Sequence, residues 1–180
     1  MKQAHPGLVV WKTQQEIRRE IARMAKEIRR DFRNRDLQIM GILRGVFVFM
    51  ADLLRKIDMP VGCHFVNIYY KDILIGDNQV KEIEEAVIYP TVDMNGKTVL
   101  LLCDVVDTGI IIDHIRNLIK LRGAASVHIG AVLDKKWMRR TDLKVDYALF
   151  EDTEECFVMG YGLDFHEQYR QLPFLARLKG

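Results

Sequence analysis

Cysteine is scarce in this sequence, with three residues in 180, and long apolar runs are missing. Cys63, Cys103 and Cys156 lie far apart and form no CxxC pair, so neither a disulfide framework nor a zinc site is predicted. The apolar run near the N-terminus, residues 7–11, is too short for a signal peptide or a membrane helix. These absences favour a protein of the reducing cytoplasm.

An excess of charge of one sign is missing as well. The formal net charge is +2 at pH 7, with 29% charged and 49% hydrophobic residues. This near-neutral balance does not indicate a nucleic-acid binder, whereas a small anionic ligand needs only a local positive site. The length fits one domain over residues 1–180, and no repeat, linker or low-complexity tract divides it.

Hydrophobic periodicity predicts alternating helices and strands. A helix is expected over 13–32, begun by a capping box of Thr13 and Glu16, and further helices are expected over 46–57 and 110–121. The alternation predicts an α/β fold with a mainly parallel sheet. Strands are expected at 37–43, 63–70, 86–89, 98–103, 126–133, 147–150 and 156–161, and the polar segment 71–85 is predicted to form a mobile loop or a hairpin.

Residues 99–112 carry the strongest chemical signal, because a buried strand is followed by two aspartates, a Thr-Gly pair and a helix. The carboxyl ends of parallel strands form ligand crevices, and a helix N-terminus attracts phosphate. Carboxylates beside such a site suggest ribose hydroxyls or magnesium between them. No Gly-Lys-Ser/Thr or GxGxxG pattern is present here, which argues against a P-loop or a dinucleotide site. A purely structural aspartate-rich helix cap explains the same residues.

The segment resembles the phosphoribosyl-pyrophosphate (PRPP) motif of the phosphoribosyltransferases. Three further segments resemble the hypoxanthine-guanine branch of that family in order and spacing: 41–54 its pyrophosphate loop and helix, 134–136 its purine-contacting lysine, and 157–172 its C-terminal hood. The resemblance implies a type I phosphoribosyltransferase fold with a small hood from residues 1–12 and 152–180. It also implies transfer of phosphoribose from PRPP to hypoxanthine or guanine, with Mg²⁺, in a homodimer or homotetramer.

The resemblance assigns roles to individual residues. Asp107 would be the general base near the purine N7, Lys135 would donate to the 6-oxo group, and Asp104 and Asp164 would serve as magnesium ligands. Tyr69 and Tyr70 would belong to a lid that closes over the reacting centre. The implied contacts are Asp104, Val105, Val106, Asp107, Thr108, Gly109, Ile110 and Ile111 for ribose 5-phosphate; Arg44, Gly45 and Arg170 for pyrophosphate; and Lys135, Phe157, Val158 and Asp164 for the purine.

Three positions depart from the family pattern. Cys103 stands where a carboxylate is usual, Ile111 where a hydroxyl is usual, and Tyr69 where a small residue is usual. A lost charge-assisted hydrogen bond costs about 1.5–3 kcal/mol. Two alternatives therefore stay open: a catalytically weakened protein that binds PRPP or a nucleotide in a regulatory role, and an enzyme for xanthine or a non-purine base. The lysines and arginines of 135–140 also have a plainer interpretation, as a solvated basic loop.

Overall fold

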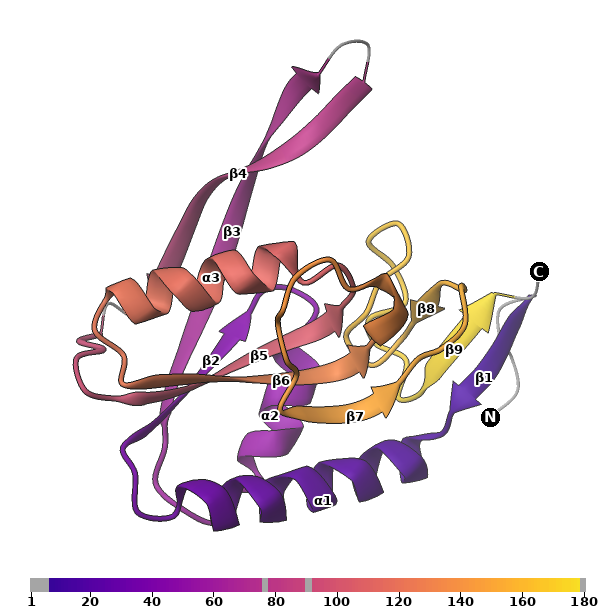
Figure 1. Cartoon of the computed structure of the whole chain (residues 1–180). Coiled ribbons are helices and arrows are strands. Elements are labelled where there is room, and N and C mark those ends of the chain that lie inside the picture. The colour runs from indigo at the N-terminus through magenta and orange to yellow at the C-terminus, as the bar shows by residue number, and fades with distance from the viewer. Residues whose placement is uncertain (1–6, 76–77, 90–91, 179–180) are drawn as a thin grey trace.

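The computed structural model describes residues 7–75, 78–89 and 92–178, and for 70–75 and 78–83 it describes the backbone. The first six residues of the predicted hood therefore lie outside the described residues. In the described part, three α-helices pack around a six-stranded sheet, and a three-stranded sheet stands at one end (Figure 1). No helix of this part is long and apolar enough to cross a bilayer.

The elements follow one another along the chain as helices and strands, with one short 3-10 helix. Their bounds are β1 (Leu8–Lys12), α1 (Gln14–Phe32), β2 (Leu37–Ile42), α2 (Phe47–Leu54), β3 (Gly62–Ile75), β4 (Asn78–Tyr89), β5 (Thr98–Val106), α3 (Ile110–Leu121), β6 (Ser126–Asp134), a 3-10 turn (Lys136–Met138), β7 (Tyr147–Glu151), β8 (Val158–Met159) and β9 (Leu175–Leu178).

The large sheet has the strand order β4-β3-β2-β5-β6-β7. The β3–β4 pair is antiparallel and the other neighbours are parallel, which confirms the predicted α/β class with a mainly parallel sheet. The small sheet, with the order β1-β9-β8, is antiparallel and brings strands from the two ends of the chain together. The small sheet, which we call the hood, stands beyond the end of the large sheet toward which β5, β6 and β7 run, as Figure 1 shows.

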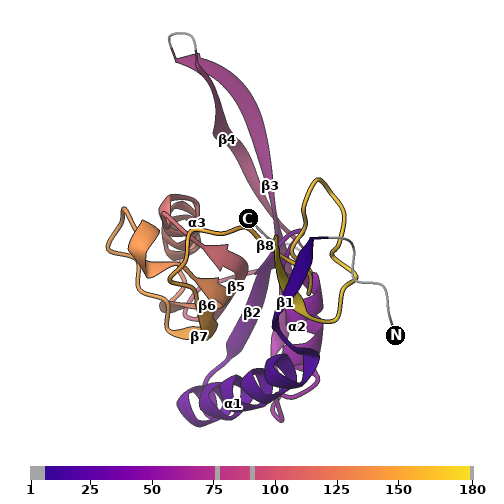
Figure 2. The ribbon, with the colours of Figure 1, turned by 90° about the vertical axis from the view of Figure 1, so that its right-hand side faces the viewer.

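Helices cover both faces of the large sheet because its central strands are apolar on both sides. In β5, Leu100 and Leu102 pack into the cluster that α1 and α2 share, whereas Leu101 and Cys103 pack with α3. Figure 2 shows α2 and α3 on opposite sides of the sheet. Because successive side chains of a strand point to opposite faces of the sheet, the two cores lie on opposite sides of it.

The N-terminus of α1 confirms the predicted capping box. The Thr13 hydroxyl accepts from the backbone N–H of Glu16 at 3.3 Å, and the Glu16 carboxylate accepts from the backbone N–H of Thr13 at 2.8 Å. The apolar stripe of this helix, including Ile17, Ile21 and Ile28, is buried. Burial of such a stripe is the main source of stability for an amphipathic helix.

The hairpin that was one of the two alternatives for the polar segment 71–85 is formed by β3 and β4, which pair antiparallel in the described residues and project from the body (Figure 1). One predicted segment differs in the structure. The strand expected over 156–161 is reduced to β8, because the backbone turns through positive φ angles at Gly160, Tyr161 and Gly162. Left-handed conformations do not continue a strand.

Candidate active site

The ends of three neighbouring parallel strands, β2, β5 and β6, meet at one edge of the large sheet. The loop after β2 carries Arg44 and Gly45, and the peptide bond between Leu43 and Arg44 is cis. Asp107 follows β5, and Lys135 follows β6. Such an edge is the usual ligand crevice of an α/β sheet, so three sequence segments that the resemblance selected lie at one place.

Asp104 lies half-buried at the end of β5 and packs against Gly45. Its Oδ1 accepts from the backbone N–H of Val105 at 2.9 Å, while its Oδ2 lies against Gly45. A Cβ on Gly162 would stand 2.3 Å from the Gly45 carbonyl oxygen, so the turn after β8 also touches this loop. Burial raises the pKa of the Asp104 carboxyl, and the nearby Asp164 carboxylate adds to the rise.

The turn between β5 and α3 leads into the N-terminus of a helix. The Asp107 carboxylate is exposed, and its Oδ1 accepts from the backbone N–H of Thr108 at 2.6 Å. Gly109 caps α3 with a φ of 80°, a conformation that glycine adopts without strain. The first N–H groups of α3, from Ile110 and Ile111, follow at the helix end that favours negative charge. Their side chains are 52% and 37% exposed, so neither is needed in the core.

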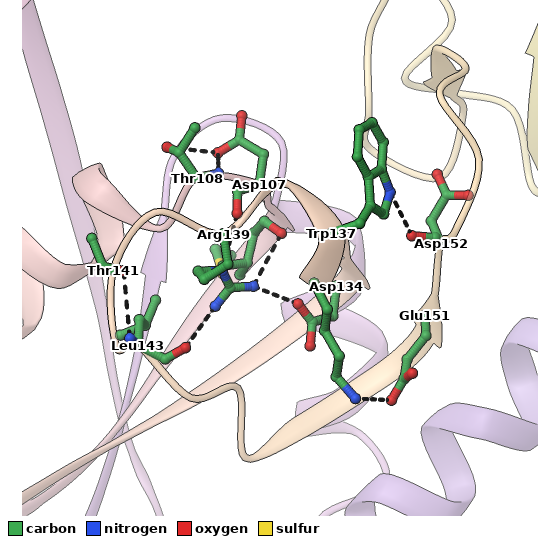
Figure 3. Close-up of polar contacts among 12 residues, drawn as sticks. Asp107, Thr108, Asp134, Trp137, Arg139, Thr141, Leu143, Glu151 and Asp152 are labelled. Carbon is green, nitrogen blue, oxygen red and sulfur yellow. Dashed lines mark hydrogen bonds and ion pairs between the residues drawn. The ribbon is translucent and has the colours of Figure 1, made fainter.

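Arg139 holds this turn from below, which corrects its interpretation as part of a solvated loop (Figure 3). Its guanidinium donates to the backbone oxygens of Asp107 at 3.0 Å and Leu143 at 2.8 Å. The same group is ion-paired with the buried Asp134. Only 13% of the Arg139 side chain is exposed. The sequence showed only a basic cluster, because the partners of Arg139 come from the ends of β5 and β6 and from the loop before β7.

A cavity of about 310 Å³ opens beside these strand ends. Phe157 is 51% exposed and meets Phe165 edge to face, with 5.3 Å between ring centroids. An apolar slot with a few polar groups at its rim suits a flat heterocycle. The lining residues that the sequence predicted are Asp104, Val105, Asp107, Lys135, Phe157, Val158 and Asp164, and the others are Leu133, Met138, Cys156 and Leu163.

The two predicted pyrophosphate arginines pair with acids of the C-terminal segment. Arg44 contacts Glu167 at 2.8 Å, and Arg170 contacts Asp164 at 2.7 Å and Glu167 at 3.5 Å. Arg170 also donates to the Gly162 carbonyl oxygen at 2.9 Å. The arginines therefore lie close to one another through a shared carboxylate, in an arrangement that an incoming polyanion can compete for.

Three predicted site residues remain, Val106, Tyr69 and Tyr70. Val106 is buried in the core below the turn. Tyr69 is 47% exposed on β3, where the register with β4 shifts, whereas the Tyr70 side chain lies outside the described residues. Within the described residues no three His, Cys, Asp or Glu side chains gather into a metal-ligand cluster. Asp104 and Asp164 are close enough to repel, and a divalent cation that also binds substrate oxygens needs only such a pair.

Comparison with known proteins agrees with this geometry. The sequence profile of the phosphoribosyl transferase domain matches residues 12–166. The hypoxanthine-guanine phosphoribosyltransferase of Dictyostelium discoideum is 34% identical over 172 residues, which cover 93% of each chain. That of Bacillus subtilis is 30% identical, covering 93% of this chain and 91% of the relative. A solved hypoxanthine phosphoribosyltransferase from Staphylococcus aureus superposes with a TM-score of 0.83 at 28% identity, covering 95% of this chain and 91% of that one.

Proposed function

The chain belongs to the phosphoribosyltransferase family and is an enzyme of purine salvage, and from this premise we propose how its residues carry the reaction. A nitrogen of a 6-oxopurine, hypoxanthine or guanine, bonds to the anomeric carbon of PRPP. The bond from that carbon to pyrophosphate breaks, and the base loses a proton. The products are IMP or GMP and pyrophosphate. The convergence of Asp104, Asp107 and Lys135 on one cavity is the observation that carries the proposal.

Asp107 and Lys135 act on opposite sides of the base. The exposed Asp107 carboxylate accepts the base proton as the new bond forms, because a carboxylate beside the purine N7 stabilises the positive charge that develops there. The Lys135 ammonium donates to the 6-oxo group, which favours 6-oxopurines over a 6-amino base. Phe157 stacks on the ring, and the backbone of Val158 contacts its edge, which is supported by their shared cavity.

The phosphate groups of PRPP bind at the two flanks of the cavity. The turn Thr108–Ile111 receives the 5-phosphate through backbone N–H groups and the Thr108 hydroxyl, as a helix N-terminus allows, and Asp104–Asp107 lie beside the ribose. Arg44, Gly45 and Arg170 receive the pyrophosphate, whose oxygens replace the carboxylate of Glu167 on the arginines. The lid role of Tyr69 and Tyr70 belongs to this proposal and would exclude water during transfer.

Asp104 and Asp164 would hold Mg²⁺ together with substrate oxygens. The fit is supported by the raised pKa of the Asp104 carboxyl, which burial raises first and the nearby Asp164 carboxylate raises further, because a cation held by both carboxylates would stabilise their charged forms. When bound, Mg²⁺ offsets the negative charge that develops on the leaving pyrophosphate. Asp104 also accepts from ribose hydroxyls, and Asp164 keeps Arg170 in place until the substrate arrives.

A direct assay tests the proposal. Purified protein is mixed with PRPP and Mg²⁺ and with hypoxanthine, guanine or xanthine in turn, and nucleotide formation is followed. We expect product with hypoxanthine or guanine, and a loss of about 10²–10⁴-fold in kcat in Asp107→Ala. If product forms with xanthine alone, the acceptor base is xanthine and not hypoxanthine or guanine. No product from any base, together with PRPP binding by calorimetry, would favour the regulatory alternative.

The same proposal includes assembly and location. We propose that the chain forms a homodimer or homotetramer, and a groove of about 1050 Å³ between α1, α2 and the C-terminal segment, beside the exposed Phe47, supports a contact there. Light scattering of the purified chain tests this. All three cysteines are free thiols, which supports a cytoplasmic location.

A further inference from the structure

The Lys135 side chain is anchored by the protein before any base arrives. Its Nζ donates to the Cys156 carbonyl oxygen at 3.0 Å and lies 3.3 Å from Oδ2 of Asp152. An ammonium group has three protons to donate. One of them goes to the Cys156 carbonyl oxygen, and the Asp152 carboxylate holds the ammonium as an ion pair, so protons remain for an acceptor in the cavity that Lys135 lines.

Asp152 is held rigidly and stands outside that cavity. Its backbone N–H donates to the Asp134 carbonyl oxygen at 3.0 Å. Its own carbonyl oxygen accepts from the Trp137 indole at 3.0 Å (Figure 3). The residue is 1% exposed. Because its backbone is tied both to the end of β6 and to the 3-10 turn after Lys135, its carboxylate has a defined position relative to the lysine.

The two carboxylate oxygens of Asp152 have different partners. Oδ1 accepts from the guanidinium of Arg177 and from the backbone N–H of Glu154 at 3.3 Å. Oδ2 is thereby left to face Lys135. Arg177 lies on β9 of the hood, and its guanidinium stacks 4.0 Å from the centroid of the Trp11 ring on β1. Through Arg177, the buried acid therefore connects the lysine of the cavity to β9, the central strand of the small sheet, and to Trp11 on its outer strand β1.

Without these contacts, the Lys135 ammonium could pair with other carboxylates of the cavity. Asp104, Asp107 and Asp164 line the same cavity, and each offers a carboxylate to a flexible ammonium. A pairing with Asp107 would occupy the proposed general base. A buried carboxylate that is ion-paired with the ammonium limits the rotamers of a side chain with high conformational entropy.

We propose that Asp152 is a positioning residue, which aims the Lys135 ammonium at the acceptor base and keeps it away from the cavity acids. The inference rests on the proposed purine contact of Lys135. Asp152 touches neither substrate, so its effect appears in binding of the base and of the nucleotide product. PRPP binds at the other flank and is unaffected.

The variant Asp152→Asn tests this, because an amide of the same shape turns an N–H group toward one of the two cations. We expect the KM for hypoxanthine or guanine to rise about tenfold, with kcat and the KM for PRPP within twofold. Binding of IMP, measured by calorimetry, weakens by a similar factor. An unchanged base KM in folded Asp152→Asn overturns the inference. Absence of turnover in the starting protein would instead count against the proposed function.

Two control variants distinguish an effect of Asp152 on Lys135 from an effect of Asp152 on the stability of the hood. Glu154→Gln removes the second acid partner of Arg177 and leaves Lys135 untouched, so the base KM stays unchanged. Arg177→Met weakens the attachment of β9 but leaves Asp152 to Lys135, so thermal stability falls while the base KM stays within twofold. If Arg177→Met raises the base KM as much as Asp152→Asn does, Asp152 acts through the hood and the inference is wrong.

A measurement on the unaltered protein covers the case in which Asp152→Asn does not fold. Nitrogen-15 NMR detects lysine ammonium protons that are held in hydrogen bonds, because their exchange with water is slow. We expect a resolved signal for Lys135 at neutral pH, identified by its loss in Lys135→Arg. Exchange as rapid as that of the exposed Lys136 would overturn the inference.

Discussion

Gly45 and Asp104 lie in contact so close that no other residue fits at position 45 without displacing the carboxylate. A Cβ built on Gly45 would stand 1.8 Å from Oδ2 of Asp104 and 2.5 Å from its Cγ. The contact joins the loop after β2 to the end of β5. It therefore sets the distance between the proposed pyrophosphate loop and the proposed ribose and magnesium contact.

The first prediction concerns this contact. Gly45→Ala pushes the Asp104 carboxylate away from its place, and a misplaced group costs on the order of 10²-fold in kcat/KM. The assay with PRPP and hypoxanthine measures it. Gly96→Ala is the control, because its Cβ meets nothing within 4 Å, although its φ of +70° makes the change cost about 1 kcal/mol in stability. Equal activities of the two variants would contradict the prediction.

Arg139 gives the second prediction. Arg139→Met removes the donors to the Asp107 carbonyl oxygen and leaves Asp134 buried without its cation. We expect the free energy of unfolding to fall by about 3–5 kcal/mol. We also expect the KM for PRPP to rise, because the turn between β5 and α3 loses its support. Arg140→Met is the matched control, since only the backbone N–H of Arg140 contacts this turn. Thermal unfolding and PRPP titration distinguish the two, and similar results for both would count against a special role of Arg139.

The third prediction has the opposite sign, because the proposed pyrophosphate site would share its arginines with Glu167. Glu167→Gln frees the Arg44 guanidinium from its carboxylate, so pyrophosphate and PRPP bind more tightly. Both side chains are more than half exposed, and exposed pairs contribute about 0.2–1 kcal/mol, which limits the gain to a few-fold in KM. Glu155→Gln is the control, as an exposed acid of the same segment. Weaker PRPP binding in Glu167→Gln would show that Glu167 orients the arginine instead.

The fourth prediction concerns the thiol that replaces a family acid. Burial raises the pKa of Cys103 well above its ordinary value, and the Asp104 carboxylate beside it raises it further. The thiol therefore stays neutral and cannot act as the missing carboxylate. A raised pKa in the folded state means that the stability this group contributes is complete at neutral pH and is lost as the pH rises through the raised value.

Alkylation of the native protein at pH 8 tests this. The exposed Cys63 is labelled, whereas Cys103, which is 1% exposed and donates to the Gly130 carbonyl oxygen at 3.5 Å, is labelled only after unfolding. Cys103→Ala should also flatten the loss of stability at alkaline pH. Labelling of Cys103 at the rate of Cys63 would contradict the prediction.

Local patterns in the sequence were sufficient for most of the elements. The capping box of Thr13 and Glu16, and the apolar period that follows it, predicted α1 because both depend on residues three or four positions apart. The strand-turn-helix of 99–112 was predicted for the same reason. The strands β1 and β9 escaped notice, because strands of five and four residues are too short to show an internal period and exist through their pairing with each other.

For the cavity, the sequence predicted several of the lining residues but not the contacts that hold them in place. The resemblance selected Asp104, Asp107 and Lys135, and the parallel order of β5 and β6 explains why they meet. It did not select Arg139 or Asp152. A charged side chain in a basic or acidic stretch carries no sign of burial, and these two are buried by partners from other strands.

The sequence alone determined the α/β class, the positions of the helices and the order of the segments that resemble the family, because each of these depends on neighbours along the chain. The tertiary structure alone decided the contact between Gly45 and Asp104 and the direction of the Lys135 ammonium. Both depend on packing between distant segments, whose spacing is set by strand order and by the volume of buried side chains.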